Sequence, residues 1–304
     1  MNSQPMPQSI TRSSNHQIRV PDHSLSRLPD SRAPDAVGRA ARLELVFEAR
    51  RGRTILAHAY AEPPFRVGRA FELDDAAYVI LGCTGPGIFA GDTLRQSVRV
   101  ASGARVVLVS QSALQAHPSS AEAAASIAHD YAVDADGELC CQSDPVIPFA
   151  GARLEQRFDI NLDASARLLW GDAIMAGRIR RGEAWRFESL MHELRLSIGG
   201  SLMYLERYAL APNHRQIAQR WMAGTARYLA TALVHHDRAT AEAAEALQCG
   251  IGEGVVVGVD LIGPGTIAGR MMARDGAPFA RARAAFLTQA QAAIFGGPAR
   301  TPRK

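Results

Sequence analysis

Lysine is almost absent from this sequence of 304 residues: Lys304 is its single lysine, so arginine carries nearly all of the positive charge. Without an internal lysine, the chain can form neither a Walker A phosphate loop nor a Schiff base with pyridoxal phosphate. The net charge is +4, and the arginines are scattered among Asp and Glu instead of forming one basic run. This pattern is typical of a mixed, solvated surface and argues against a nucleic-acid partner. A basic docking face for an acidic protein remains open.

Cysteines, aromatic residues and long apolar runs are also scarce. The four cysteines show no CxxC spacing, and adjacent Cys140 and Cys141 would point to opposite faces of a strand, so we expect reduced, mostly buried thiols. Only 6% of the residues are aromatic, which disfavours a sugar-stacking hydrolase. No apolar run approaches the roughly 20 residues of a membrane-spanning helix, and the N-terminus lacks a secretory pattern. We therefore expect a cytoplasmic protein with no membrane partner.

The composition divides the chain into three parts. Residues 1–38 are rich in Ser, Pro, Arg, Asp and Asn and show no helical or strand period, which predicts a disordered N-terminal extension. Residues 39–296 are expected to form a single β-rich domain, and residues 297–304 a C-terminal tail. With 47% hydrophobic residues, the chain is long enough to bury a substantial core.

Alternating apolar and polar residues, beginning near Arg42, predict many short strands. Turn formers such as Ser102-Gly103, Asp136-Gly137 and Gly199-Gly200 separate them at the short spacing of layered antiparallel β structure, and an irregular β-helical stack would also fit. The expected extended segments are 43–47, 54–60, 77–82, 93–100, 105–110, 126–133, 138–142, 154–159, 167–174, 185–188, 193–198 and 201–210.

Helical character is confined to the C-terminal third. An Ala/Glu-rich run predicts a helix over 239–247, and a second alanine-rich run predicts one over 280–295, with extended stretches at 254–261 and 266–274 between them. The predicted fold class is mainly β (α+β): an irregular layered or β-helical stack of many short strands with about two α-helices in the C-terminal third.

Enzyme motifs are incomplete in this sequence. The glycines at 250, 252 and 254 follow a helix and precede a strand, which is the reverse of a dinucleotide-binding turn. His192-Glu193 lacks the second histidine of a zinc protease, and there is no Gly-x-Ser-x-Gly elbow. His235-His236-Asp237 is either a metal cluster or, because adjacent side chains on a strand diverge, a polar turn. We therefore expect a protein that is not an enzyme.

Six short motifs follow one another in the middle of the chain. They are Gly-Arg-Thr at 52–54, Gly-Pro-Gly-Ile-Phe-Ala-Gly-Asp at 85–92, Ser-Gln-Ser-Ala at 110–113, Ser-Asp-Pro-Val-Ile-Pro-Phe at 143–149, Gly177-Arg178 with Arg-Gly-Glu at 181–183, and Leu-Glu-Arg at 205–207. In this order, over roughly residues 42–290, the sequence resembles the urease accessory protein UreD (UreH) family. Two departures from the family pattern are Pro86, which interrupts a glycine pair, and Gln115 with His117 in place of a common Lys-Tyr pair.

The resemblance implies a cytoplasmic metallochaperone scaffold required for nickel insertion into apo-urease. Its implied partners are UreF, the GTPase UreG and the urease apoprotein subunits. It implies no tightly bound cofactor, only a transient nickel ion in a polar passage. Matching motif positions places Asp172 and Glu206 on that passage, with Ser110 as a further candidate.

Other functions remain open for the same residues. Asp172 could instead form a salt bridge with an arginine such as Arg178, and Glu206 could pair with Arg207 or with an arginine of another strand. The chain could be a purely structural adaptor between urease and UreF that never contacts nickel. A β-rich hydrolase using Asp172 and Glu206 as acid and base is a third hypothesis. Asp92 and Asp144 are expected to be loop formers, because Asx turns are common at such positions.

Overall fold

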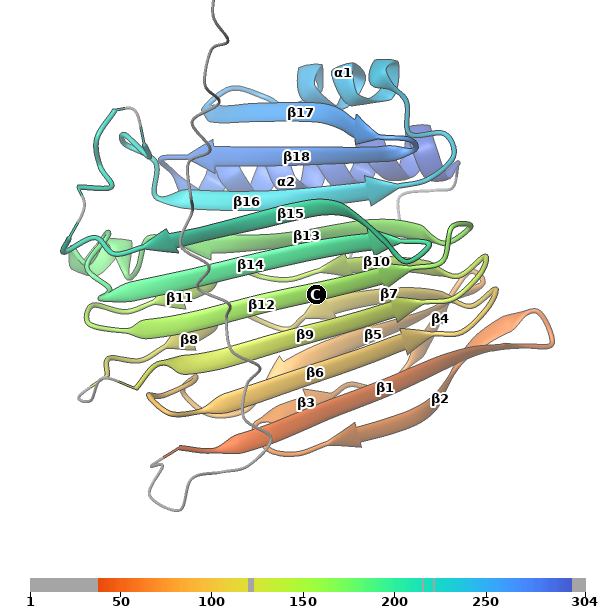
Figure 1. The fold of residues 1–304 in the computed structure, drawn as a ribbon, viewed down its shortest axis with the longest axis horizontal. Coiled ribbons are helices and arrows are strands. Elements are labelled where there is room, and N and C mark those ends of the chain that lie inside the picture. Colours follow the sequence, from red (N-terminus) through yellow and green to blue (C-terminus); the bar gives the residue numbers. More distant parts are fainter. Residues whose placement is uncertain (1–37, 120–122, 215, 221, 297–304) are drawn as a thin grey trace, which may run out of the picture. The chain divides into compact units, whose positions relative to one another are not determined.

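The computed structural model describes residues 38–119, 123–214, 216–220 and 222–296. These residues form two large β-sheets and two α-helices, which confirms the predicted mainly β fold (Figure 1). Apart from Gly38, the predicted N-terminal extension lies outside the described residues, and so does the predicted tail at 297–304. Within the described part, no helix is both long and apolar enough to cross a membrane.

Sheet A has seven strands in the order β15-β14-β12-β9-β6-β1-β2. Strands β1, β6, β9, β12 and β14 run parallel to one another, while β2 and β15 add antiparallel edges. Their bounds are β1 Ala40–Arg50, β2 Arg53–Ala61, β6 Thr93–Val100, β9 Ala125–Val133, β12 Arg153–Leu162, β14 Ser189–Ile198 and β15 Ser201–Leu210.

Sheet B has eleven strands, eight of them in the order β17-β18-β16-β13-β10-β7-β5-β3. Strands β5, β7, β10 and β13 are parallel, and β16, β18 and β17 extend the sheet antiparallel. Their bounds are β3 Phe65–Val67, β4 Phe71–Leu73, β5 Ala76–Cys83, β7 Arg105–Ser110, β8 Leu114–Ala116, β10 Glu138–Gln142, β11 Val146–Pro148, β13 Arg167–Met175, β16 Tyr228–His235, β17 Val255–Gly263 and β18 Thr266–Ala273.

From β5 to β14 the chain passes back and forth between the two sheets and so winds as a β-solenoid-like stack, with β7–β8 and β10–β11 each giving two successive strands to sheet B. Four-residue turns at 101–104, 134–137 and 163–166 carry the chain from sheet A to sheet B. The turns stack: Asp134 N donates to Val100 O at 2.9 Å, and Asp163 N donates to Val133 O at 2.8 Å. The predicted antiparallel layering is therefore wrong for the middle of the chain, whereas the β-helical alternative is confirmed.

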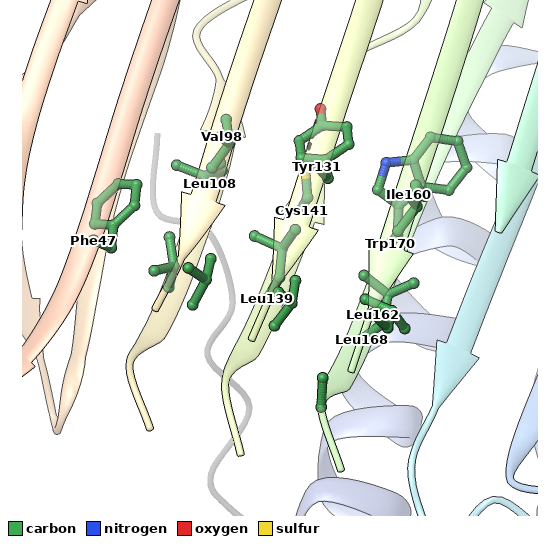
Figure 2. Packing of buried hydrophobic residues seen from close by; sticks show 14 of the residues in the cluster. Phe47, Val98, Leu108, Tyr131, Leu139, Cys141, Ile160, Leu162, Leu168 and Trp170 are labelled. Carbon is green, nitrogen blue, oxygen red and sulfur yellow. Dashed lines mark hydrogen bonds between the residues drawn. The ribbon is translucent and has the colours of Figure 1, made fainter. Parts of the chain in front are cut away.

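Apolar side chains from both sheets fill the space between them (Figure 2). Phe47, Phe158 and Trp170 are fully buried there, and burial of this kind is the main stabilising contribution to the fold. The helices α1 (Ala241–Cys249) and α2 (Gly276–Ala290) cover the opposite face of sheet B, with Phe279 and Phe286 packed on its strands. Short helical turns η1 (Ile179–Arg181) and η2 (Gln291–Phe295) complete the described elements.

The opposite face of sheet A is polar and carries ion pairs. Arg99 Nη2 on β6 lies 2.9 Å from a carboxylate oxygen of Asp134, in the turn after β9, and within β12 Arg157 Nε lies 2.8 Å from a carboxylate oxygen of Asp159. In each pair at least one side chain is more than one quarter exposed to solvent, so the pair contributes little to stability. Sheet A thus has one polar face and one buried face.

Some local predictions differ from the structure. The segment 185–188 is irregular and not a strand: Trp185, at its start, lies in a turn with a left-handed φ of 57°, outside the β region. β16 was not predicted, although it lies inside sheet B between β13 and β18. The predicted helix over 280–295 is α2 followed by the π-helical turn η2.

Candidate functional site

Two neighbouring extended segments of sheet B are each interrupted along the chain, and the two interruptions lie side by side. Residues 111–113 separate β7 from β8, and residues 143–145 separate β10 from β11. Pro145 fits such a break, since proline has no N–H to donate to a ladder. Asp144 N donates to Ser110 Oγ at 2.5 Å, which ties the two breaks together. A cavity of about 100 Å³ lies beside the two breaks, and residues of both breaks line it.

Asp172 lies on β13 directly beside the second break. In the parallel pairing of β10 with β13, Gln142 is the last residue of β10 and faces Gly171, so Asp172 has no ladder partner on that side. On its other side, Asp172 faces Thr231 of β16. The Asp172 side chain points between the sheets and is only 3% exposed. The break thus leaves a buried carboxyl group next to open space.

The electrostatic environment of Asp172 disfavours its charged form. Burial raises the pKa of the Asp172 carboxyl to about 7, although the Ala173 N–H and the positive charge of Arg283 act in the opposite direction. Gln156 Nε2 donates to Asp172 Oδ2 at 3.3 Å. Asp172 Oδ1 is buried and has no hydrogen-bond partner among the described residues. Near neutral pH this carboxyl group is therefore present in both its protonated and its ionised form.

A second, larger cavity of about 580 Å³ lies on the other side of Asp172. Besides Asp172, its polar lining includes His192, Glu206, Tyr208 and Arg270. These residues come from β13 and β18 of sheet B and from β14 and β15 of sheet A. Among the described residues, Asp172 is the only one that lines both cavities.

Glu206 is buried in this larger cavity and is already paired. Arg270 Nη2 lies 2.8 Å from Glu206 Oε2, Tyr204 OH donates to the same oxygen at 2.8 Å, and Thr231 Oγ1 lies 3.3 Å away. Pairing with an arginine of another strand was one of the predicted alternatives. Arg207, the other predicted partner, pairs instead with Glu193 at 2.6 Å.

A row of polar side chains faces these cavities from sheet A. Gln96, His129, Gln156 and His192 each occupy an inward position on one of four parallel strands, where the neighbouring inward positions are mostly apolar. Gln96 lies beside His129 in register, and Gln156 lies beside His192. Burial lowers the pKa of both histidines to about 4, so both rings are neutral at pH 7.

Several buried atoms of this row have no hydrogen-bond partner within the described residues: His129 Nδ1, Gln156 Oε1 and both ring nitrogens of His192. Each of the three residues lines one of the two cavities. Buried polar atoms in native proteins are almost always satisfied, if not by protein then by ordered water or an ion. Ordered water or another small polar partner between the sheets would satisfy these atoms.

The predicted site residues fall on one or both cavities. Asp172 shares the larger cavity with Glu206 and the smaller with Ser110, but Ser110 and Glu206 line different cavities. Arg178, the expected partner of Asp172, pairs with Glu183 instead, at 2.5 Å between Nη2 and Oε1. Asp92 behaves as the predicted loop former, since its carboxylate accepts hydrogen bonds from the backbone N–H of Arg39 and of Phe89.

The His235-His236-Asp237 segment does not assemble a metal site in the described part of the chain. His235 Nδ1 lies 3.0 Å from Thr266 Oγ1, and His236 Nδ1 accepts from Arg238 N at 3.1 Å and contacts Asp237. No group of three or more His, Cys, Asp or Glu side chains converges as a metal would require anywhere among the described residues. The segment is a polar turn at the end of β16.

Residues 39–304 match the UreD urease accessory protein family. The chain belongs to the UreD family. A urease accessory protein UreD of Sorangium cellulosum is 36% identical over 210 residues, which are 69% of this chain and 66% of the relative. UreD of Lysinibacillus sphaericus is 29% identical over 64% of this chain and 74% of its own length, and that of Trichodesmium erythraeum is 35% identical over 48% and 54%. The match thus spans between about half and three quarters of these relatives, whose names describe accessory proteins and not enzymes.

Two UreD-like motifs acquire a structural meaning from the site. The Ser-Gln-Ser-Ala motif at 110–113 and the start of the Ser-Asp-Pro motif at 143–149 are the two breaks in sheet B. The sequence prediction missed His129, Gln156, His192 and Arg270 as site residues of this UreD-family chain. The available signal was a polar residue in the inward phase of several strands, where an uninterrupted core would place an apolar one.

Proposed function

We propose that this chain is a non-catalytic scaffold that assists nickel insertion into apo-urease. In this proposal it works in the cytoplasm, in a complex with UreF and UreG, and docks on the urease apoprotein. Nickel is cargo and not a resident cofactor: the ion passes between the two sheets, along Glu206, Asp172 and Ser110. Family membership supports the accessory role, and the geometry between the sheets supports the passage.

The observation that carries the passage is the position of Asp172 between two cavities that each contain several polar side chains. A carboxyl group that lines both, and that has one oxygen without a hydrogen-bond partner among the described residues, is placed to hand an ion from one cavity to the other. The unpartnered atoms of His129, Gln156 and His192 continue the polar lining on both sides. A hydrated ion is accommodated where such atoms face a cavity, since each supplies a hydrogen-bond or ligand position.

The donor set suits transfer better than storage. Carboxylate and hydroxyl oxygens bind first-row divalent ions less firmly than a Cys/His cage does, and the described residues form no convergent group of three strong ligands. An ion held by one or two donors at a time leaves easily. A chaperone that must release its cargo requires this property.

The test is co-expression of the full chain with its cognate urease and accessory proteins. The variants are Asp172→Asn and Glu206→Gln, singly and together, with Glu193→Gln as the matched control, because Glu193 is equally buried but faces away from the cavities. We expect the double variant to reduce the nickel content and activity of urease by about tenfold or more, by analogy with losses of supporting metal contacts. Pull-down should show an unchanged complex.

Each alternative has its own outcome in this experiment. Normal nickel loading by the double variant, with intact assembly, would leave the purely structural adaptor. Urease activation that is independent of the wild-type chain would overturn the accessory role. A hydrolase would require turnover by the isolated chain that both Asp172→Asn and Glu206→Gln abolish.

A further inference from the structure

His192 is a buried histidine to which the proposed passage assigns no role beyond lining. Its side chain is 3% exposed, and neither ring nitrogen has a hydrogen-bond partner among the described residues. A structural histidine in a core is normally bonded through at least one nitrogen, as His235 is to Thr266. Because His192 also lines the 580 Å³ cavity, its two unpartnered nitrogens point to a ligand or to water in that cavity.

The ring of His192 is held in place by its neighbours. It stacks on Tyr208 with ring centroids 4.7 Å apart and planes 8° from parallel, and Phe158 packs on its other side at 5.7 Å. Gln156 lies beside it in the β12–β14 register. Packing therefore fixes the orientation of the ring without occupying either nitrogen, which is the condition for a preorganised donor.

The charge state also suits a cation ligand. Burial, together with the nearby positive charge of Arg270, lowers the pKa of His192 to about 4, so the ring is neutral and keeps a lone pair at pH 7. Two carboxylate residues, Asp172 and Glu206, line the same cavity. Neutral imidazole suits nickel, zinc and copper, whereas oxygen donors alone suit magnesium and manganese.

We propose that His192 is a nitrogen ligand for a first-row divalent cation in the larger cavity, and that it gives this cavity its preference for nickel over oxygen-seeking ions. This inference rests on the proposed passage. His192 would bind the ion together with Asp172 or with Glu206 once Arg270 releases it. With so few donors the binding is weak and reversible, as transit requires.

The experiment titrates Ni²⁺ into the full-length chain, carrying no affinity tag, and follows side-chain NMR signals. Paramagnetic Ni²⁺ should broaden the ring signals of His192 and the methyl signal of Thr231, which lines the same cavity. His235 is the internal control, because its Nδ1 is bonded to Thr266 and it lines neither cavity. Its ring should broaden only at much higher Ni²⁺ concentration.

Two variants separate ligation from packing. His192→Phe keeps an aromatic ring on Tyr208 without nitrogen, and His192→Gln keeps polarity without a ring. In both we expect the Ni²⁺ concentration that half-broadens Thr231 to rise by about tenfold or more. For Mn²⁺, which prefers oxygen ligands, we expect a change of less than about twofold. Thermal melting of each variant verifies that the fold is retained.

The outcomes distinguish this inference from the proposed function. If Ni²⁺ broadens Thr231 equally in the wild-type chain and in both variants, the ion uses the cavity without His192, and the inference is overturned while the passage stands. Equal losses for Ni²⁺ and Mn²⁺ would make His192 a packing residue. If Ni²⁺ leaves Thr231 unaffected even in the wild-type chain, the inference and the passage both fail, and dependence of urease activation on the chain then decides the accessory role separately.

Discussion

Replacing Asp172 with asparagine should make this protein more stable at neutral and alkaline pH, because the substitution removes a charge that the fold buries. Burial raises the pKa of the Asp172 carboxyl to about 7, from an ordinary value of 3.8. Asparagine has nearly the same size and keeps an oxygen that can accept from Gln156 Nε2. It carries no charge that must be desolvated at any pH.

The size of the effect follows from the pKa of Asp172. A rise of about three pKa units, at roughly 1.4 kcal/mol for each unit, corresponds to about 4 kcal/mol. Between pH 3.8 and about 7, the folded chain binds more protons at this site than the unfolded chain, so the wild-type free energy of unfolding falls as pH rises. Below this window the two chains should be similar; above it, Asp172→Asn should be more stable by up to about 4 kcal/mol.

Urea unfolding curves, recorded at several pH values from about 4 to about 8, measure the difference. Glu155→Gln is the charge control, because it removes the same charge from the polar face of sheet A. The expected result is a gap between wild type and Asp172→Asn that widens steadily with pH. A gap that stays constant across this range would refute the desolvation of Asp172, and with it the account of this residue as a strained functional group.

Two further predictions concern neighbouring features. Arg270→Gln should lower the free energy of unfolding by about 1–2 kcal/mol. This value lies between the losses expected for a surface ion pair and for a fully buried one, because the Glu206 side chain is 4% exposed but that of Arg270 is 57% exposed. The same variant should bind Ni²⁺ more tightly in the NMR titration, because Glu206 loses its resident cation. In the native chain Cys249 should react first with a thiol reagent, whereas Cys141 should react only on unfolding, because it is buried and its pKa is raised to about 12.

Strand positions could be predicted from the sequence because they depend on local alternation. In β12, Leu154, Phe158, Ile160 and Leu162 point inward between polar neighbours, and this pattern identifies a strand whatever it pairs with. Helix α1 could be predicted for the same reason, since its alanine-rich run has intrinsic helix propensity. Local chemistry therefore determined the elements and the fold class.

Strand pairing could not be predicted in this way. The turn at 134–137, with Asp136-Gly137, has the composition of a hairpin turn, but it carries the chain from one sheet to the other. Whether such a turn joins paired or facing strands depends on the next coil of the chain, which lies about 30 residues away in the stacked turns. β16 was missed because its pattern, Tyr228–His235, is nearly continuous and apolar, as expected for a strand buried within a sheet.

Only some residues of the candidate site could be predicted from the sequence, and their spatial relations could not. Asp172, Glu206 and Ser110 were identified through motif positions, and the structure puts them on two cavities that Asp172 shares. No local sequence pattern indicates that Glu206 forms its ion pair with Arg270, which lies some 64 positions later in the chain. His192 was examined only as part of a zinc-protease motif, which is a helical pattern, although its strand places it inward beside Gln156.

The inner face of sheet A changes along its strands from apolar to partly polar. Toward the stacked turns, Val98, Tyr131, Ile160 and Leu196 lie side by side in register and are buried, and of these four only Tyr131 lines one of the two cavities. Two residues further from the turns, Gln96 and His129 are polar while Phe158 and Leu194 are still apolar, and Gln156 and His192 follow two residues later. Sheet B breaks at this partly polar end. A closely packed row of this kind resists rearrangement, so it can hold the adjacent side chains in place although several of their polar atoms have no partner among the described residues. Buried polar atoms without partners lower stability. Apolar substitutions at Gln156 or His192 should therefore strengthen the fold, and if the proposed function holds they should at the same time impair nickel transfer; a merely imperfect core would show only the gain in stability.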